Sequence, residues 1–117
     1  MTAILDREMS LSIFERMLTM RHFEEAIILL YNEGRFASHY HIYIGQEATG
    51  AGVLEALGDE DIICTTHRNH GHIVGRGSDS GRAMAEILGR ATGFNGGRPR
   101  ISAIARPESL PRPTMWP

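Results

Sequence analysis

The 117-residue sequence contains no lysine and only one cysteine. All twelve basic residues are arginine, which we interpret as a consequence of a GC-rich coding sequence rather than of a binding function. Cys64 has no partner for an internal disulfide, which is consistent with a reducing compartment. The net charge of −2 gives no general attraction to nucleic acid or to an anionic membrane.

Long apolar segments are also absent. The longest apolar run, residues 26–31, is far too short to span a bilayer. The N-terminus lacks a basic region followed by an apolar core, so no secretory signal is expected and the cytoplasm is the predicted location. A chain of this length forms one domain at most, and such a domain buries roughly two thirds of its unfolded surface.

Proline is missing from the first 98 residues, and all five prolines lie in residues 99–117. Charge changes near the same point. Residues 1–97 contain eight arginines and thirteen acidic residues, a net charge of −5, whereas residues 98–117 contain four arginines and one glutamate, a net charge of +3. We therefore predict an ordered domain over residues 1–97 and a Pro/Arg-rich disordered tail over residues 98–117.

The apolar periodicity predicts a long helix over residues 10–33. Ser12 and Glu15 fit a capping box at its start, and Gly34 fits a left-handed stop at its end. The stripe expected to be buried comprises Phe14, Met17, Met20, Phe23, Ile27, Leu30 and Tyr31. The opposite, solvated face is expected to carry Glu15, Arg16, Glu24, Glu25 and Glu33.

Residues 35–43 show no helical period and are expected to form a loop or extended segment. A second helix is predicted over residues 46–57, with Ala48, Ala51 and Leu54 on one face, and Gly50 and Gly52 suggest close packing against another backbone. Residues 62–66 are apolar and β-branched, which favours a strand buried on both faces. Further helices are expected over residues 69–75 and from a cap at 77–79 to near Gly93. The predicted fold class is α/β, mostly helical with one short buried strand.

Five of the six histidines lie between residues 38 and 77, at positions 39, 41, 67, 70 and 72. Histidines at such spacing could supply three nitrogen ligands to zinc, although the spacing matches no common zinc signature. Ordinary polar or core histidines explain the same pattern, and we assign no metal ligands. A small His-rich metal-binding protein remains an alternative reading.

Arg68 lies at the end of the predicted strand, where ligands bind in open α/β sheets. Its guanidinium and the start of the following helix would together suit a phosphate. A surface ion pair with one of the many carboxylates explains Arg68 equally well, so both readings stay open here.

Four motifs occur in order between about residues 12 and 97, and together they carry a resemblance to a known family. They are residues 21–25 (RHFEE), His41 with residues 44–48 (IGQEA), residues 67–71 (HRNHG), and residues 84–90 (MAEILGR) followed by Gly93. The chain resembles the N-terminal part of the alpha subunit of thiamine diphosphate-dependent 2-oxo acid dehydrogenases. That family includes the pyruvate, branched-chain and acetoin dehydrogenases.

The resemblance implies a thiamine diphosphate-binding fold and an oxidoreductase. By analogy with the family, His41 is a catalytic residue near the reactive ring of the cofactor, and His67 and Arg68 bind thiamine diphosphate, with Arg68 reaching the diphosphate. The implied reaction is oxidative decarboxylation with acyl transfer to lipoamide. The implied partners are a beta subunit in a heterotetramer and a lipoyl-bearing acyltransferase. His67 stands where many members have tyrosine, which resembles the acetoin dehydrogenase alpha subunits. Gln46 and Glu47 are expected to support a helix start.

Beyond residue 97 the sequence departs from the family, whose Mg²⁺-binding Gly-Asp-Gly motif is absent. We hypothesise that the chain is a truncated alpha subunit, inactive alone, with residues 98–117 read out of frame. A frame carrying Gly-Asp-Gly downstream of codon 97 would support this, and its absence from both other frames would refute it. A non-catalytic helical interaction module, binding through Met20, Phe23, Ile27 and Leu30, is a further alternative.

Overall fold

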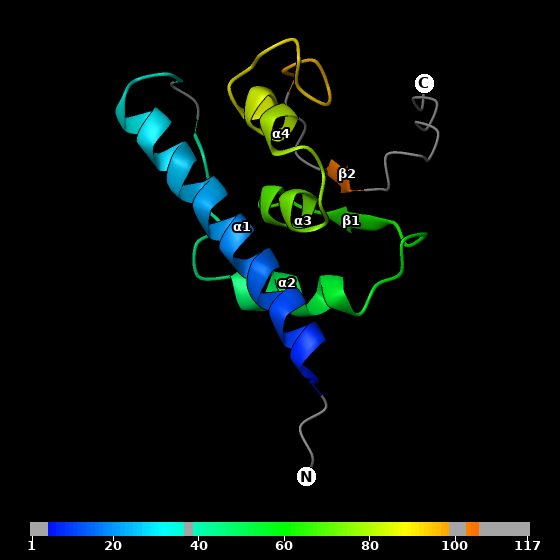
Figure 1. The fold of residues 1–117 in the computed structure, drawn as a ribbon. Coiled ribbons are helices and arrows are strands. Elements are labelled where there is room, and N and C mark those ends of the chain that lie inside the picture. The colour runs from blue at the N-terminus through cyan, green and yellow to red at the C-terminus, as the bar shows by residue number, and fades with distance from the viewer. Residues whose placement is uncertain (1–4, 37–38, 99–102, 106–117) are drawn as a thin grey trace.

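The computed structural model describes residues 5–36, 39–98 and 103–105 (Figure 1). Within these residues the elements are α1 (Arg7–Asn32), α2 (Glu47–Glu55), β1 (Ile63–Thr65), α3 (His70–Gly75), α4 (Ser80–Ile87) and β2 (Ala103–Ala105). Helices α2 and α3 pack against α1 and against each other, and α4 packs on α3. None of the helices in this described part is both long enough and apolar enough to cross a membrane. The mostly helical character predicted from the sequence is confirmed.

Helix α1 begins three residues before the predicted start. Its N-cap is Asp6, whose carboxylate accepts a hydrogen bond from the Met9 amide at 2.8 Å. The predicted capping box is therefore wrong, and the Ser12 hydroxyl instead donates to Glu55 of α2 at 2.8 Å. At the other end, Gly34 has a φ of 71°, which confirms the left-handed stop.

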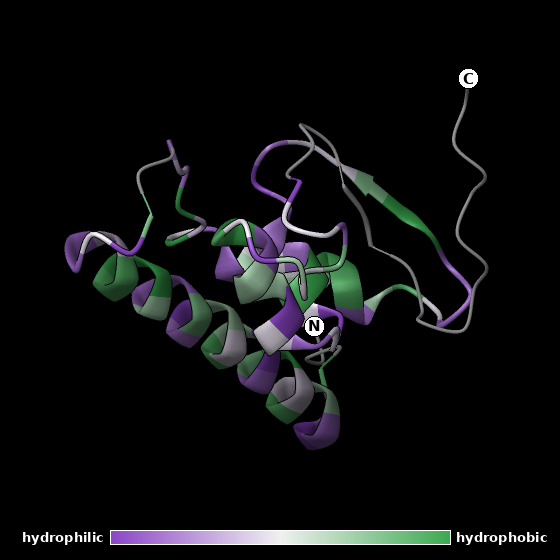
Figure 2. Ribbon diagram, turned by 90° about the horizontal axis from the view of Figure 1, so that it is seen from above, coloured by the Kyte–Doolittle hydropathy of each residue, from purple (hydrophilic) through white to green (hydrophobic). Residues whose placement is uncertain are grey.

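The centre of the apolar stripe on α1 forms the core, where Met20 and Ile27 are fully buried. The ends of the predicted stripe lie outside it, because Phe14 is 55% exposed and Tyr31 is 53% exposed. Figure 2 shows how apolar and polar residues alternate along α1. One cluster consists of Met20, Tyr43, Ala51 and Leu54, and a second of Phe23, Ile27, Val74 and Ala83. Since the core uses Met20, Phe23 and Ile27, these side chains are not available as an interaction stripe.

Helix α2 follows a loop that is irregular over its described residues, as predicted, but the helix ends at Glu55 rather than at 57. A Cβ at Gly50 would lie 2.3 Å from the Tyr43 hydroxyl oxygen, so this glycine does mark close packing, although against a side chain rather than a backbone. Gly52 has nothing within 4 Å of a Cβ position, and Ala48 is exposed. Close packing is thus found at one of the two glycines, and the predicted backbone neighbour is found at neither.

Strand β1 pairs antiparallel with β2, and Cys64 lies opposite Ile104. The prediction of a strand buried on both faces is wrong, because Ile62 beside it is 58% exposed and Cys64 is exposed. A two-stranded ribbon leaves much of each strand open to solvent, whereas a central strand is covered on both sides. β2 belongs to the segment predicted as a disordered tail. The rest of that segment past residue 98 lies outside the described residues.

Helices α3 and α4 lie close to their predicted positions. Asp79 caps α4 by accepting a hydrogen bond from the Arg82 amide at 2.8 Å, as expected for the 77–79 turn. However, α4 ends at Ile87 rather than near residue 93. The chain reverses at Gly89, which has a φ of 68°, and the Glu86 carboxylate accepts from the amides of Asn95 and Gly97 at 2.8 and 3.0 Å. These contacts favour a closed loop over further helical turns.

Candidate functional site

The rings of His41 and His67 pack edge to face, with centroids 4.9 Å apart and planes at 71°. His41 comes from the loop between α1 and α2, and His67 lies two residues after the end of β1. Both residues are exposed, so a ligand could reach them. The fold therefore brings together two of the three residues singled out in the sequence, from segments that are distant along the chain.

Arg68, the third residue, follows His67 at the end of β1 and is half-buried. Its Nε is buried and has no hydrogen-bond partner among the described residues. Within the same residues Arg68 also forms no salt bridge. Buried polar atoms are nearly always hydrogen-bonded, so an unpaired guanidinium nitrogen suits an anionic group from outside this part of the chain.

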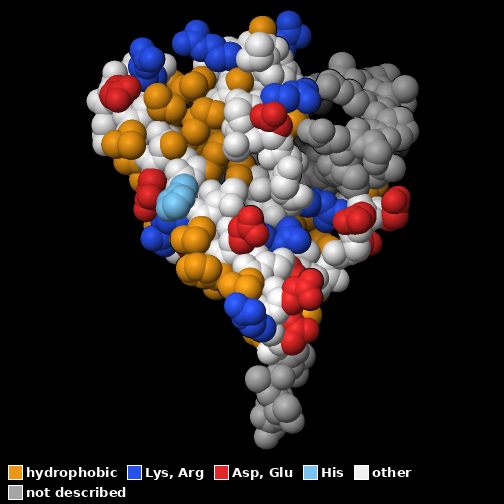
Figure 3. Space-filling view, in the orientation of Figure 1, with side chains coloured by type: hydrophobic (Ala, Val, Ile, Leu, Met, Phe, Trp, Pro, Cys, Tyr) orange, Lys and Arg blue, Asp and Glu red, His pale blue; other side chains and the backbone are white. Residues whose placement is uncertain are grey.

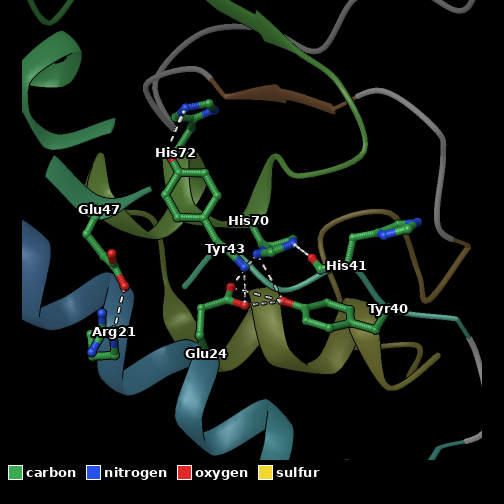
Figure 4. Close-up of polar contacts among 8 residues, drawn as sticks. All are labelled: Arg21, Glu24, Tyr40, His41, Tyr43, Glu47, His70 and His72. Carbon is green, nitrogen blue, oxygen red and sulfur yellow. Dashed lines mark hydrogen bonds and ion pairs between the residues drawn. The ribbon is translucent and has the colours of Figure 1, made fainter. Parts of the chain in front are cut away.

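A buried carboxylate lies next to this site (Figure 4). Glu24 on α1 is fully buried. Its oxygens accept hydrogen bonds from the Tyr43 amide at 2.8 Å and from the Tyr40 hydroxyl at 3.0 and 3.2 Å. Glu24 also contacts Nδ1 of His70, the first residue of α3. The side chain expected on the solvated face of α1 is thus at the centre of a polar cluster.

The same cluster reaches the backbone of His41. The second ring nitrogen of His70, Nε2, lies 3.0 Å from the carbonyl oxygen of His41. Figure 4 shows this carbonyl turned towards His70 while the His41 ring points away from the Glu24 carboxylate. His70 therefore connects a buried carboxylate on α1 to the loop that carries His41.

Two tyrosines of this loop stay protonated. Burial raises the pKa of Tyr40 strongly, and the nearby Glu24 carboxylate raises it further. Burial also raises the pKa of Tyr43, with smaller contributions from Glu47 and Glu24. A phenol that keeps its proton can donate, so Tyr40 remains a hydrogen-bond donor to Glu24 throughout the neutral range.

Glu47 forms a second polar anchor at the start of α2. Its carboxylate binds Arg21 Nε at 2.7 Å and accepts from the Gly45 amide at 2.9 Å. The hydrogen bond from Arg21 holds the pKa of Glu47 below its usual value, although burial acts in the opposite direction. The same bond raises the pKa of the Arg21 guanidinium. As predicted, Glu47 supports the helix start, and it does so by fixing the turn before α2.

His72 links the loop to β1. Its Nε2 lies 3.1 Å from the Tyr43 hydroxyl, and its Nδ1 lies 3.0 Å from the Thr65 hydroxyl. Burial lowers the pKa of His72, and His70 lowers it further. The described histidines near the site thus divide into an exposed pair and two separate hydrogen-bonded positions. No group of three or more His, Cys, Asp or Glu side chains within the described ranges is arranged to hold a metal.

A surface hollow in this region is separate from the histidine pair. It is a hollow of about 280 Å³ lined by Ile27, Ile28, Tyr31, His39, Tyr40 and Ile42. Figure 3 shows apolar side chains gathered over the part of the molecule where Figure 1 places the C-terminal half of α1. His41, His67 and Arg68 do not line the hollow, so it is not the predicted cofactor site.

Sequence reasoning missed Glu24, Tyr40 and His70 as members of one cluster. A signal for Glu24 existed, because position 24 lies within the helical repeat of Met20 and Ile27. The signal was easily missed, because a charged glutamate close to other glutamates is expected to lie on a solvated face. No local pattern in the sequence could indicate the partner on α3.

Comparison with known proteins identifies the family. Residues 15–110 match the family model described as dehydrogenase E1 component. The chain belongs to this E1 family. The alpha subunit of acetoin:2,6-dichlorophenolindophenol oxidoreductase from Cupriavidus necator is 39% identical over 94 residues, and its Bacillus subtilis counterpart is 40% identical over 94 residues. The pyruvate dehydrogenase E1 component subunit alpha from Zymomonas mobilis is 44% identical over 94 residues.

The aligned region covers 80% of this chain but only 27 to 28% of each of these E1 relatives. The chain therefore spans less than a third of their length. The search of solved structures found no match. The family indicated by the four motifs is confirmed, whereas the roles of His41, His67 and Arg68 stay predictions.

Proposed function

We propose that this chain forms part of the thiamine diphosphate site of an E1 alpha subunit. The proposal is supported chiefly by the contact of 4.9 Å between the ring centroids of His41 and His67, which unites a loop residue with the end of β1. Arg68 adjoins His67, and its Nε, which has no hydrogen-bond partner among the described residues, fits a group that carries negative charge.

In this proposal each residue has a distinct task. Arg68 binds the diphosphate through its planar fork of donors. His67 lies beside it against the cofactor. His41 faces the reacting centre, where an imidazole can donate or accept a proton. Thiamine diphosphate, when bound, supplies the electron sink for cleavage next to a carbonyl group. Mg²⁺ would be bound by residues that this sequence lacks.

Membership of the E1 family supports a proposal for the wider activity. We propose a 2-oxo acid dehydrogenase of the pyruvate type, which decarboxylates its substrate oxidatively and passes the acyl group to lipoamide. Its partners would be a beta subunit, in a heterotetramer, and a lipoyl-bearing acyltransferase, in the cytoplasm. We expect no turnover from this chain alone. An acetoin dehydrogenase alpha subunit is the second candidate, supported by His67 and by the names of the Cupriavidus and Bacillus relatives.

Calorimetric titration of the purified chain with thiamine diphosphate and Mg²⁺ tests the proposal. We expect Arg68→Ala to weaken binding about tenfold or more, because a hydrogen bond to a charged group contributes about 1.5–3 kcal/mol. Thiamine without the diphosphate should bind wild type and Arg68→Ala alike. The matched control is Arg90→Ala, which removes an exposed arginine. Equal losses in the Arg68 and Arg90 variants, or no preference for the diphosphate form, would refute the site.

A further inference from the structure

The Glu24 carboxylate holds the loop before α2 at three points. It accepts from the Tyr43 amide, it accepts from the Tyr40 hydroxyl, and through His70 it reaches the His41 carbonyl. These three contacts lie on both sides of the His41 Cα. They come from helices α1 and α3, which pack against each other and are therefore fixed in relation to one another.

The hydrogen-bond pattern around His70 determines where its protons lie. The His41 carbonyl can only accept a hydrogen bond, so the Nε2 atom that faces it carries a proton. Nδ1 faces the Glu24 carboxylate, and one further proton between these two groups satisfies both. His70 is 5% exposed and Glu24 is fully buried. An imidazolium paired with a carboxylate satisfies both buried groups, whereas removal of either charge leaves the other unpaired.

The His41 ring has few constraints of its own. His41 is exposed, and within the described ranges its imidazole makes no hydrogen bond and packs only edge to face on His67. The direction of the ring is therefore set mainly by the backbone at residues 40–43, which Glu24 and His70 hold. A side chain with several free rotamers gains a defined position only when its backbone is fixed.

We propose that Glu24 is a positioning residue for His41, acting through His70 and the loop backbone. The inference rests on the proposed role of His41, since a fixed imidazole matters only if the ring takes part in the reaction. Catalytic groups must be held close to their productive geometry by neighbours that are themselves fixed. A buried carboxylate with three partners on the catalytic loop provides such a support.

Nuclear magnetic resonance of the 117-residue chain tests this inference without any cofactor. The readouts are the nuclear Overhauser effect between the ring protons of His41 and His67 and the ring-nitrogen shifts of His70. In Glu24→Gln we expect the His41–His67 effect to fall at least threefold and the His70 Nδ1 signal to move towards that of a neutral imidazole. Glu25→Gln is the matched control, because the adjacent glutamate is exposed, and it should leave both readouts unchanged.

A folded Glu24→Gln chain with the wild-type His41–His67 effect would overturn the inference, and so would an equal loss in Glu25→Gln. If Glu24→Gln fails to fold, Tyr40→Phe keeps both members of the Glu24–His70 pair and removes the Tyr40 hydroxyl, which contacts the Glu24 carboxylate and, at 2.9 Å, His70 Nδ1. We expect it to lower the effect by about half, and an unchanged effect would overturn the inference. If the wild-type chain does not bind thiamine diphosphate but the His41–His67 effect still depends on Glu24, only the proposed function is refuted.

Discussion

Two buried glutamates, Glu24 and Glu47, show how this chain uses carboxylates in its interior. Each accepts a hydrogen bond from a backbone amide, and each contacts a basic side chain, His70 for Glu24 and Arg21 for Glu47. A buried carboxylate with these partners stabilises a specific loop geometry, whereas an unpaired one would be strongly destabilising. The two residues hold neighbouring parts of the loop that carries His41, at residues 40–43 and at Gly45.

Glu47→Gln should lower the free energy of unfolding by about 1 kcal/mol at pH 7, since it removes the charge that Arg21 faces but keeps an acceptor for the Gly45 amide. The exposed position of Arg21 limits the loss. The Arg21 hydrogen bond lowers the pKa of Glu47, so the stabilisation is present above its ordinary pKa of 4.5 and is lost as pH falls through the folded value. Urea unfolding at pH 7 and pH 3 measures this.

The unfolding free energies of wild type and Glu47→Gln should therefore become more similar as the pH falls. Glu33→Gln is a suitable control, because Glu33 is exposed and its pairing distance to Arg35 is 3.9 Å. We expect no measurable change from it at either pH. A difference between wild type and Glu47→Gln that persists undiminished at pH 3 would contradict the assignment.

His72 should make stability depend on pH just below neutrality. Burial, and secondarily His70, hold the pKa of His72 below its ordinary value of 6.5. The unfolded chain thus binds a proton more readily than the folded chain, so the contribution of neutral His72 is complete above pH 6.5 and declines as pH falls. We expect wild type to lose stability between pH 7.5 and 5.5, and His72→Gln to lose less over the same interval. The measurement is the denaturant midpoint of each protein at the two pH values. An equal change in midpoint for wild type and His72→Gln would exclude this role.

At the level of elements, Tyr43 determines how α2 and α3 approach the loop. A Cβ at Gly50 of α2 would lie 2.3 Å from the Tyr43 hydroxyl oxygen, and a Cβ at Gly71 of α3 would lie 2.3 Å from the Tyr43 ring. Real Cβ atoms do not approach so closely, so both glycines are required by the tyrosine rather than by a turn. The loop and two helices therefore form one packing unit.

The contact between Tyr43 and Gly50 predicts a rescue. Gly50→Ala should destabilise the chain by about 1–3 kcal/mol, because the added methyl group overpacks against the hydroxyl. Tyr43→Phe removes that hydroxyl and the hydrogen bond to His72, at a loss of about 1 kcal/mol. The double variant should be more stable than the sum of the two changes implies, because the methyl group then has room.

A double-mutant cycle from urea unfolding gives the coupling directly. Gly52→Ala is the matched control on α2, since its Cβ would meet nothing within 4 Å and alanine is the better helix former. It should stabilise the chain by about 0.5–1 kcal/mol and show no coupling to Tyr43→Phe. Strict additivity of Gly50→Ala and Tyr43→Phe would rule out the steric explanation.

The elements differ in how far the sequence could predict them. Periodicity located α1 and α4, and Gly34 and Asp79 marked the end of α1 and the start of α4, whereas the predicted start of α1 and end of α4 were wrong. The prediction that β1 is buried was wrong, because burial depends on which strand pairs with Ile63–Thr65. Residues 103–105 carry no local signal for that pairing. The candidate site was found only in part: motifs indicated His41, His67 and Arg68, whereas Glu24 required knowledge of a contact with α3.

On the scale of the whole molecule, apolar side chains remain exposed on α1. Leu11, Phe14 and Leu18 are 56%, 55% and 40% exposed, and their spacing of three and four residues places them on one side of the helix. They lie outside both core clusters. Exposed apolar groups of this kind favour association.

We therefore expect the purified chain to self-associate with increasing concentration. Phe14→Ser combined with Leu18→Ser should shift the apparent mass in sedimentation towards 13.0 kDa, the mass of one chain. Thr19→Ser, at an exposed polar position on the same helix, should leave the association unchanged. A concentration-independent single-chain mass for the wild type would contradict the expectation.

The pairing of β1 with β2 has a consequence for how this sheet can be extended. A strand offers hydrogen-bonding groups along two edges, and β2 occupies one edge of β1 within the described residues. Any strand contributed later, whether by more of the polypeptide or by another subunit, can join β1 only along the remaining edge. Growth of the sheet from β1 therefore has a single direction, unless the ribbon first comes apart.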